Sequence, residues 1–157
     1  QWGQPDFLIH GGQSSVAAQG NRSGSSSDRG GWRVGLTHPV WPGTRLAEIR
    51  LHDEALGTSG TGRQHFYHQG KRYGHILDPR TGLPSDALLS ATIIAPTAAV
   101  ADALATACHV LGEEQSCELI GRDPTWRALL VVPTESRDRI RVVTINLPDD
   151  RWRRIEV

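Results

Sequence analysis

A carboxylate and a hydroxyl stand four residues apart, Asp102 and Thr106, in a stretch rich in alanine. Residues four apart share one face of an α-helix, so this pair can present two oxygens to one cation. Mg²⁺ prefers oxygen ligands and usually takes few of them from the protein. The alternative interpretation is a solvated Asp102 in the first helical turn, favourable toward the helix dipole, with Thr106 bonding back to a carbonyl.

A helix is predicted to carry this pair. Pro96 and Thr97 supply its start, with Thr97 as the N-cap, and Gly112 supplies its stop. Alanines along the segment favour helix and allow close packing. The predicted apolar stripe is formed by Val100, Leu104, Cys108 and Leu111.

His75 is the second candidate for chemistry. It lies near the end of a predicted strand, residues 73–77, which runs into a turn of Asp, Pro, Arg, Thr and Gly. A side chain with a pKa near neutrality there can take a proton from a substrate hydroxyl; otherwise it is an ordinary surface or core-edge histidine. Arg80 either clamps a phosphate or pairs with Asp78.

Two glycine-containing segments lie upstream. Gly11 and Gly12 follow a predicted strand over residues 7–10, and they allow a backbone to approach a ligand closely. The tripeptide Thr58-Ser59-Gly60 is predicted to be a loop that offers amides and hydroxyls to phosphate oxygens. Such tripeptides also occur in ordinary loops.

Taken together, these motifs resemble a known family. Gly74-His-Ile-Leu-Asp-Pro-Arg-Thr-Gly82, followed by Ala101-Asp-Ala-Leu-Ala-Thr-Ala107, is similar to the ApbE family of Mg²⁺-dependent FAD:protein FMN transferases. The order and separation of the two motifs fit, and residues 8–12, 31–39 and 58–60 agree as well. The resemblance covers nearly all of residues 1–157 but only the later half or so of a typical member.

The resemblance implies an activity: Mg²⁺-dependent transfer of FMN from FAD to a Thr or Ser hydroxyl of a target protein, releasing AMP. It implies Asp102 and Thr106 as Mg²⁺ ligands and His75 as the general base. The residues assigned to FAD are Gly11, Gly12, Thr58, Ser59, Gly60, Asp78 and Arg80. FAD hydrolysis to FMN and AMP is one alternative, and a non-catalytic flavin-binding fragment without the N-terminal half is another.

This sequence departs from the family pattern at two places. Gln13 stands where the family has an acidic residue after the paired glycines, and the aromatic residue expected before Arg63 is missing.

The resemblance suggests a bacterial periplasmic or inner-membrane-anchored lipoprotein, but the chain itself does not show its compartment. Implied partners are FAD, an acceptor flavoprotein, and either the N-terminal half or a second copy of the chain.

The pattern of elements predicts one α+β domain over residues 1–157. Strands are expected at residues 32–36, 45–52, 64–68, 71–77, 88–95, 128–132, 140–145 and 152–157, with a second short helix at 113–120. The strands at 64–68 and 71–77 flank Gln69-Gly70 and are predicted to form a hairpin. They predict a mostly antiparallel sheet with helices packed on one face, as in the T-fold to which the family is likened. Residues 19–31 are predicted to be a flexible loop rich in glycine and serine.

Composition narrows the class of partner. Seventeen basic and seventeen acidic side chains balance, which argues against nucleic acid as a partner.

The sequence contains no methionine, so we interpret it as a processed chain or part of a longer one. No apolar run is long enough to span a membrane. Cys108 is predicted to be in the core, and its pairing with Cys117 is left open.

Overall fold

The structure is a computed structural model, and it describes residues 5–12, 14–22, 30–41, 43–61, 65–136 and 139–155. The two departures from the family pattern, at Gln13 and Arg63, lie outside the described residues, as does most of the predicted 19–31 loop.

The described residues form strands, one α-helix and a short 3₁₀ helix. Their order is β1 (Phe7–Gly11), β2 (Ser15–Gln19), β3 (Trp32–Thr37), β4 (Arg45–Leu51), β5 (Glu54–Gly60), β6 (His65–His68), β7 (Lys71–Gly74), β8 (Ser90–Ala95), α1 (Ala98–Ile120), β9 (Arg127–Pro133), β10 (Ile140–Ile145), η1 (Asp149–Arg151) and β11 (Trp152–Arg154).

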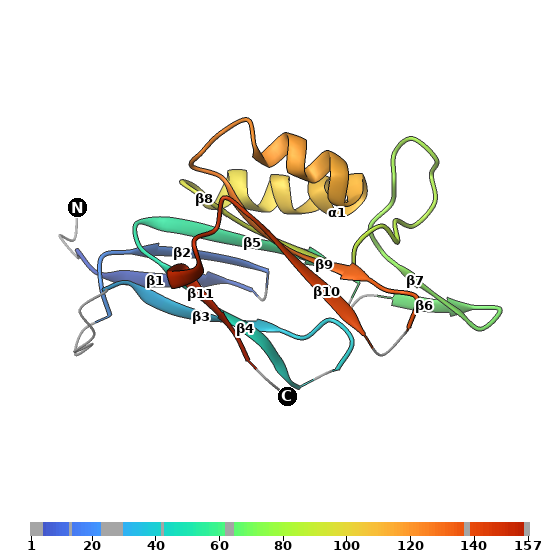
Figure 1. Ribbon diagram of the computed structural model, residues 1–157, viewed down its shortest axis with the longest axis horizontal. Coiled ribbons are helices and arrows are strands. Elements are labelled where there is room, and N and C mark those ends of the chain that lie inside the picture. The colour runs from blue at the N-terminus through green and yellow to red at the C-terminus, as the bar shows by residue number, and fades with distance from the viewer. Residues whose placement is uncertain are drawn as a thin grey trace.

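Apart from β6 and β7, which form a separate two-stranded sheet, these elements stack in three layers (Figure 1). The middle layer is a six-stranded sheet in the order β1-β2-β5-β8-β9-β10, and every neighbouring pair is antiparallel. Helix α1 covers one face of this sheet over β5 and β8, and a three-stranded sheet, β11-β4-β3, covers the other. The predicted α+β class, with helix on one face of a mostly antiparallel sheet, is confirmed.

Both faces of the central strands are buried, which explains their continuous apolar sequences. In β8, Ile94 packs toward the three-stranded sheet and Ile93 toward α1. In β9, Leu129 and Leu130 divide in the same way. The six-stranded sheet therefore separates two apolar cores. Successive side chains along a strand point to opposite faces of the sheet, so neighbouring residues enter different cores.

Helix α1 begins where predicted. Thr97 has extended backbone angles and its side chain accepts a 3.3 Å hydrogen bond from the amide of Val100. At Gly112 the backbone leaves the helical region, with φ 80°, and a second helical segment follows within the same element. The predicted stop at Gly112 and the predicted short helix after it are thus both present, joined at a break.

The predicted apolar stripe of α1 is only partly right: Cys108 is fully buried and Leu104 packs against the core. Val100, Leu104 and Leu111 are half-buried, whereas the fully buried positions of the first segment include Ala101 and Ala105. Small side chains face the sheet because the helix lies directly on its backbone. Cys108 is buried as predicted, and both cysteines are free thiols.

Three local predictions need correction. Strand β2 was not anticipated, because its buried positions, Val16 and Ala18, alternate within a short run of small residues. The tripeptide Thr58-Ser59-Gly60 is not a loop but the end of β5. His75 lies just beyond β7, which stops at Gly74. The predicted β6–β7 hairpin is confirmed, with positive φ at Gln69 and Gly70 in its turn.

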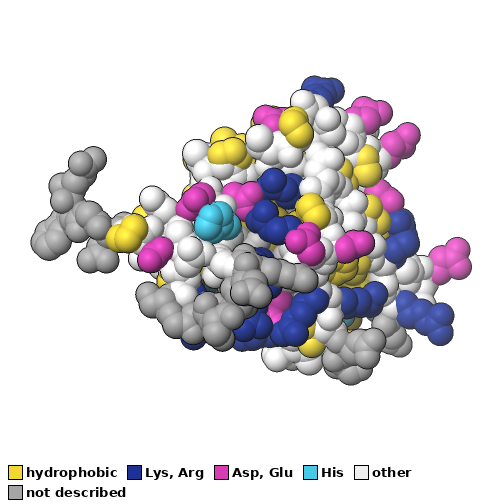
Figure 2. Space-filling model, turned by 60° about the vertical axis from the view of Figure 1, so that its left-hand side comes forward, with side chains coloured by type: hydrophobic (Ala, Val, Ile, Leu, Met, Phe, Trp, Pro, Cys, Tyr) yellow, Lys and Arg dark blue, Asp and Glu magenta, His cyan; other side chains and the backbone are white. Residues whose placement is uncertain are grey.

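Charged side chains of both signs are interspersed on the face seen in Figure 2. Glu54 binds both Arg127 and Arg151, tying β5 to β9 and η1, and Glu48 of β4 binds Arg153 of β11. The Arg151 side chain is 22% exposed, whereas that of Arg153 is 66% exposed. None of the described helices is long and apolar enough to cross a membrane.

Candidate functional site

A cavity of about 570 Å³ lies where β3, β5 and β8 meet the start of α1. Five of the residues predicted from the sequence line it, and they come from three separate parts of the chain: Thr58, Ser59, Gly60, His75 and Asp102. The fold therefore brings the His75 segment and the Asp102 helix to one crevice. Thr106 lies beside this crevice through its bond to Ser59.

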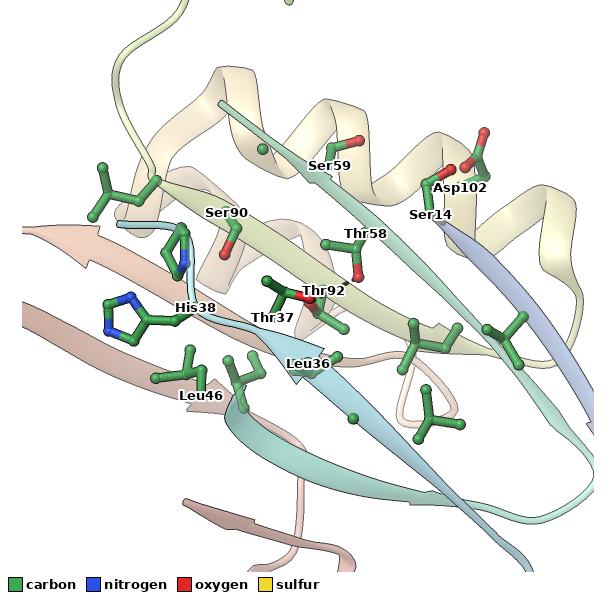
Figure 3. Close-up of a pocket in the computed structure, with 18 of the residues that line it drawn as sticks. Ser14, Leu36, Thr37, His38, Leu46, Thr58, Ser59, Ser90, Thr92 and Asp102 are labelled. Atoms are coloured by element: carbon green, nitrogen blue, oxygen red, sulfur yellow. Dashed lines mark hydrogen bonds between the residues drawn. The ribbon is translucent and has the colours of Figure 1, made fainter. Parts of the chain in front are cut away.

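The two faces of β5 contribute different hydroxyls to the crevice. Thr58 lies opposite Thr92 of β8, and their side-chain oxygens are 3.0 Å apart in a hydrogen bond. Leu56 packs in the core against the three-stranded sheet, so Thr58, two residues on, faces the same side. Figure 3 shows Thr58 and Thr92 on the side of β5 and β8 that faces β3, the strand of Leu36, and Ser59 on the side of α1, the helix that carries Asp102.

On the helix side, strand hydroxyls hold both predicted metal ligands. Ser15 Oγ of β2 donates to Asp102 Oδ1 at 2.9 Å. Ser59 Oγ of β5 lies 2.9 Å from Thr106 Oγ1, and Thr106 Oγ1 also donates to the Asp102 carbonyl at 3.3 Å. Asp102 and Thr106 are both exposed and lie one turn apart on α1.

Gly57 explains how the helix comes so close to the strands. A Cβ at this position would lie 2.6 Å from the carbonyl carbon and oxygen of Ala101 and from the amide nitrogen of Asp102. The missing side chain at Gly57 lets α1 rest on the backbone of β5. Ser15, which pairs with Gly57 across the ladder, and Ser59, two residues further, can then reach the helix.

His75 is exposed at the cavity and leads out of β7. His109 of α1 is fully buried and has no hydrogen-bond partner for either ring nitrogen among the described residues. Burial, and then the charge of nearby His75, lower the pKa of His109 to about 4. The His109 ring is therefore neutral at pH 7.

The turn after His75 is fastened internally. Asp78 accepts hydrogen bonds from the Arg80 amide at 2.9 Å and from its guanidinium at 2.8 Å. These bonds, and the charge of Arg80, hold the pKa of the Asp78 carboxyl below its usual value. Of the two interpretations for Arg80, pairing with Asp78 is the one seen. In the described part of the chain neither residue lines the cavity.

Gly11 and Gly12 serve the hairpin between β1 and β2. Gly11 pairs with Ser15. Gly12 has φ 79°, a backbone conformation that is unfavourable for residues other than glycine. Neither glycine is among the described residues that line the cavity. What they do is reverse the chain so that Ser15 faces Asp102.

Several lining residues were not anticipated from the sequence. His38 is 5% exposed, and its Nδ1 accepts from the amides of Val40 and Trp41, both at 3.1 Å. Its ring stacks on Trp41 at 4.6 Å, and burial together with the charge of Arg154 lowers its pKa. A histidine beside proline in a stiff loop was the available signal. The other missed lining residues include His10, Ser14, Thr37, Ser90 and Thr92.

The donors present fit a hard cation with a partial set of protein ligands. Asp102 uses one carboxylate oxygen for Ser15, and its other oxygen has no hydrogen bond within the described chain. No cluster of three or more His, Cys, Asp or Glu side chains suited to a metal occurs among the described residues. A carboxylate and a hydroxyl suit Mg²⁺, which takes its remaining ligands from water and phosphate.

Comparison with known proteins places the chain. The model of the ApbE family matches residues 1–130. The chain belongs to the ApbE family. It is 38% identical over 133 residues to an FAD:protein FMN transferase of Treponema pallidum, and 36% identical over 111 residues to one of Escherichia coli K12. These matches cover 79% and 69% of the chain, and 37% and 32% of the respective relatives.

Solved structures of the family agree. The ApbE protein of Thermotoga maritima matches with a TM-score of 0.68 at 32% identity, over 81% of this chain and 40% of that one. The Pseudomonas stutzeri flavinyl transferase ApbE in its apo form matches with a TM-score of 0.68 at 29% identity, over 91% of this chain and 42% of that one. This ApbE chain thus spans about two fifths of the length of those structures.

Proposed function

We propose that this ApbE chain contains the catalytic and metal-binding residues of a Mg²⁺-dependent FAD:protein FMN transferase. The observation that carries the proposal is the convergence of His75 and Asp102 on one cavity from segments of the chain that are far apart in sequence. Family membership supports flavin transfer, because the Treponema pallidum and Escherichia coli relatives bear that name.

In the proposed reaction the hydroxyl oxygen of an acceptor Thr or Ser attacks the phosphorus on the FMN side of the FAD pyrophosphate. A new phosphoester bond forms, the bond to the bridging oxygen breaks, and AMP leaves with that oxygen. His75 receives the proton of the acceptor hydroxyl, and its exposure at the cavity allows an acceptor to approach.

The cavity walls suit a dinucleotide. Thr58, Thr92 and Ser90 offer hydroxyls on one side, and leucines at 36, 46 and 56 supply an apolar surface for a ring. Asp102 and Thr106 would hold Mg²⁺, which when bound would neutralise charge on the diphosphate. Because Arg80 is already paired with Asp78, we assign it to the turn rather than to phosphate.

The test is to titrate the chain with FAD, with and without Mg²⁺, following flavin fluorescence. We expect binding that strengthens with Mg²⁺, and we expect Asp102→Ala to abolish this Mg²⁺ effect. Glu114→Ala, which removes an exposed carboxylate of the same helix, is the matched control and should leave it unchanged. A Mg²⁺ effect that survives Asp102→Ala would overturn the assignment.

Transfer is tested separately with an acceptor protein that carries a reactive Thr or Ser. Flavin bound covalently to the acceptor, together with released AMP, supports the transferase; AMP release without an acceptor identifies FAD hydrolysis instead. Both products should fall in His75→Ala. Absence of both products despite Mg²⁺-dependent FAD binding would leave a flavin-binding module and refute catalysis by the chain.

A further inference from the structure

Two serines contact the two predicted metal ligands, one serine for each ligand. Ser15 Oγ donates to Asp102 Oδ1, and Ser59 Oγ contacts Thr106 Oγ1, each at 2.9 Å. The two serines come from neighbouring strands, β2 and β5, and flank Gly57 on the face toward α1. Ser15 and Asp102 are 87 residues apart in sequence, so this contact exists because the fold creates it.

We infer that Ser15 and Ser59 are positioning residues for the cation site, each orienting one of its two oxygen ligands. This inference deepens the proposed function and rests on its cation site, not on its transfer step. Ser15 fixes the Asp102 carboxylate through Oδ1 and thereby leaves Oδ2 as the oxygen free for a metal. Without this bond, the exposed Asp102 side chain would sample several rotamers, at an entropic penalty for binding.

Ser59 acts on the proton of Thr106. A hydroxyl that binds a cation must turn its hydrogen away from it, and Thr106 Oγ1 has a suitable acceptor in the Asp102 carbonyl at 3.3 Å. With the Thr106 proton placed there, the 2.9 Å contact with Ser59 is made by the Ser59 hydrogen. The Thr106 oxygen then keeps a lone pair for the metal, held by two hydrogen bonds of fixed direction.

Groups that orient metal ligands commonly change metal affinity by about 10-fold to 100-fold when they are removed. We therefore expect Ser15→Ala to weaken binding of the metal alone by about 10-fold, and Ser59→Ala to do the same. The two serines touch different ligands, so their effects should multiply in the double variant, to about 100-fold. Ser15→Thr keeps the hydroxyl and should restore most of the affinity.

The experiment measures Mn²⁺ binding to the chain by electron paramagnetic resonance, without nucleotide and again with ADP as a diphosphate probe. This readout involves no flavin transfer, so failed transfer with intact Mn²⁺ binding would refute the proposed function and leave the positioning role standing. Ser136→Ala, an exposed serine in the β9–β10 turn, is the control and should bind like the parent chain. Thermal unfolding of each variant confirms that it is folded.

Three results would overturn the inference. The first is unchanged Mn²⁺ affinity in both alanine variants. The second is failure of the parent chain to bind Mn²⁺ with or without ADP, since there would then be no cation site to position. The third is equal loss in Ser15→Thr and Ser15→Ala, because a role in packing alone, rather than in donating a hydrogen bond, would produce it.

Discussion

The antiparallel pair β5–β8 has two ends of opposite character. At one end, which we call the apolar end, residues 55–57 pair with residues 93–95, and all of them are buried. At the other, the hydroxyl end, residues 58–60 pair with residues 90–92, and most of them are half-buried at the cavity. One ladder in one register thus serves as core over half its length and as site wall over the other half.

The change falls between Gly57 and Thr58. Up to Gly57, β5 has β2 as its neighbour; beyond it, the amide of Thr58 bonds to the Ser14 carbonyl at 2.7 Å and the β2 ladder ends. The strand therefore leaves its neighbour where its side chains become polar. The apolar end supplies the rigid frame, and the hydroxyl end uses that frame to hold oxygens at fixed places.

Gly57→Ala should have the largest effect, because it strikes the junction of the two ends. The new Cβ would meet helix backbone at 2.6 Å, and backbone cannot rotate away as a side chain can. We expect a loss of about 4 kcal/mol in unfolding free energy, above the usual range for overpacking, measured by urea denaturation.

Gly35→Ala is the matched control for this substitution. Its Cβ would lie 3.1 Å from the flexible Arg45 side chain, which can move, and we expect a change below about 1 kcal/mol. Equal destabilisation by the two substitutions would show that contact between a Cβ at position 57 and the backbone of α1 is not what destabilises the Gly57→Ala variant.

Ile93→Ala and Thr92→Val compare the two ends directly. Ile93 is fully buried against α1, and its truncation should cost about 3 kcal/mol of unfolding free energy. Thr92→Val keeps the side chain's shape but removes the hydrogen bond to Thr58, so we expect a loss of about 1 kcal/mol. Chemical denaturation of both variants measures the difference, and a larger loss for Thr92→Val would reverse our assignment of the ends.

The sequence revealed those features that depend on near neighbours. The cap at Thr97, the break at Gly112 and the turn at Gln69 and Gly70 all follow from local backbone chemistry, and all were predicted. The clustering of His75 with Asp102 was predicted because two motifs together resembled a family. None of these inferences needed knowledge of which strands pair.

Features that depend on distant contacts were missed. The bond from Ser15 to Asp102 joins residues 87 apart, and no local pattern marks Ser15. Strand β2 escaped because alanine has weak strand preference. The buried face of α1 was partly misassigned to its larger side chains, because the close approach to Gly57 selects small ones instead.

His109 predicts a dependence of stability on pH. Its folded pKa of about 4 lies below the ordinary 6.5, so the unfolded chain takes up the proton first as the pH falls. The contribution of neutral His109 to the free energy of unfolding is fully present above about pH 6.5 and is lost as the pH falls toward 4. Between pH 7 and pH 5 this group alone should account for about 2 kcal/mol.

His109→Phe isolates this contribution, because carboxylates titrate alike in both proteins. Urea denaturation at pH 7 and pH 5 should show a smaller acid loss in the variant than in the parent chain. Equal losses would mean that His109 finds a partner or solvent in the folded protein, contrary to its burial.

Arg80→Ala should have the smallest effect on stability and the most informative effect on binding. The Asp78–Arg80 pair is exposed on the arginine side, and such pairs contribute less than about 1 kcal/mol. If Arg80 serves only the turn beyond His75, the variant should bind FAD with Mg²⁺ as the parent does, in a fluorescence titration. A 10-fold weaker affinity with an unchanged melting temperature would instead give Arg80 a phosphate contact, and would extend the binding surface beyond the hydroxyl end of β5–β8 into the turn.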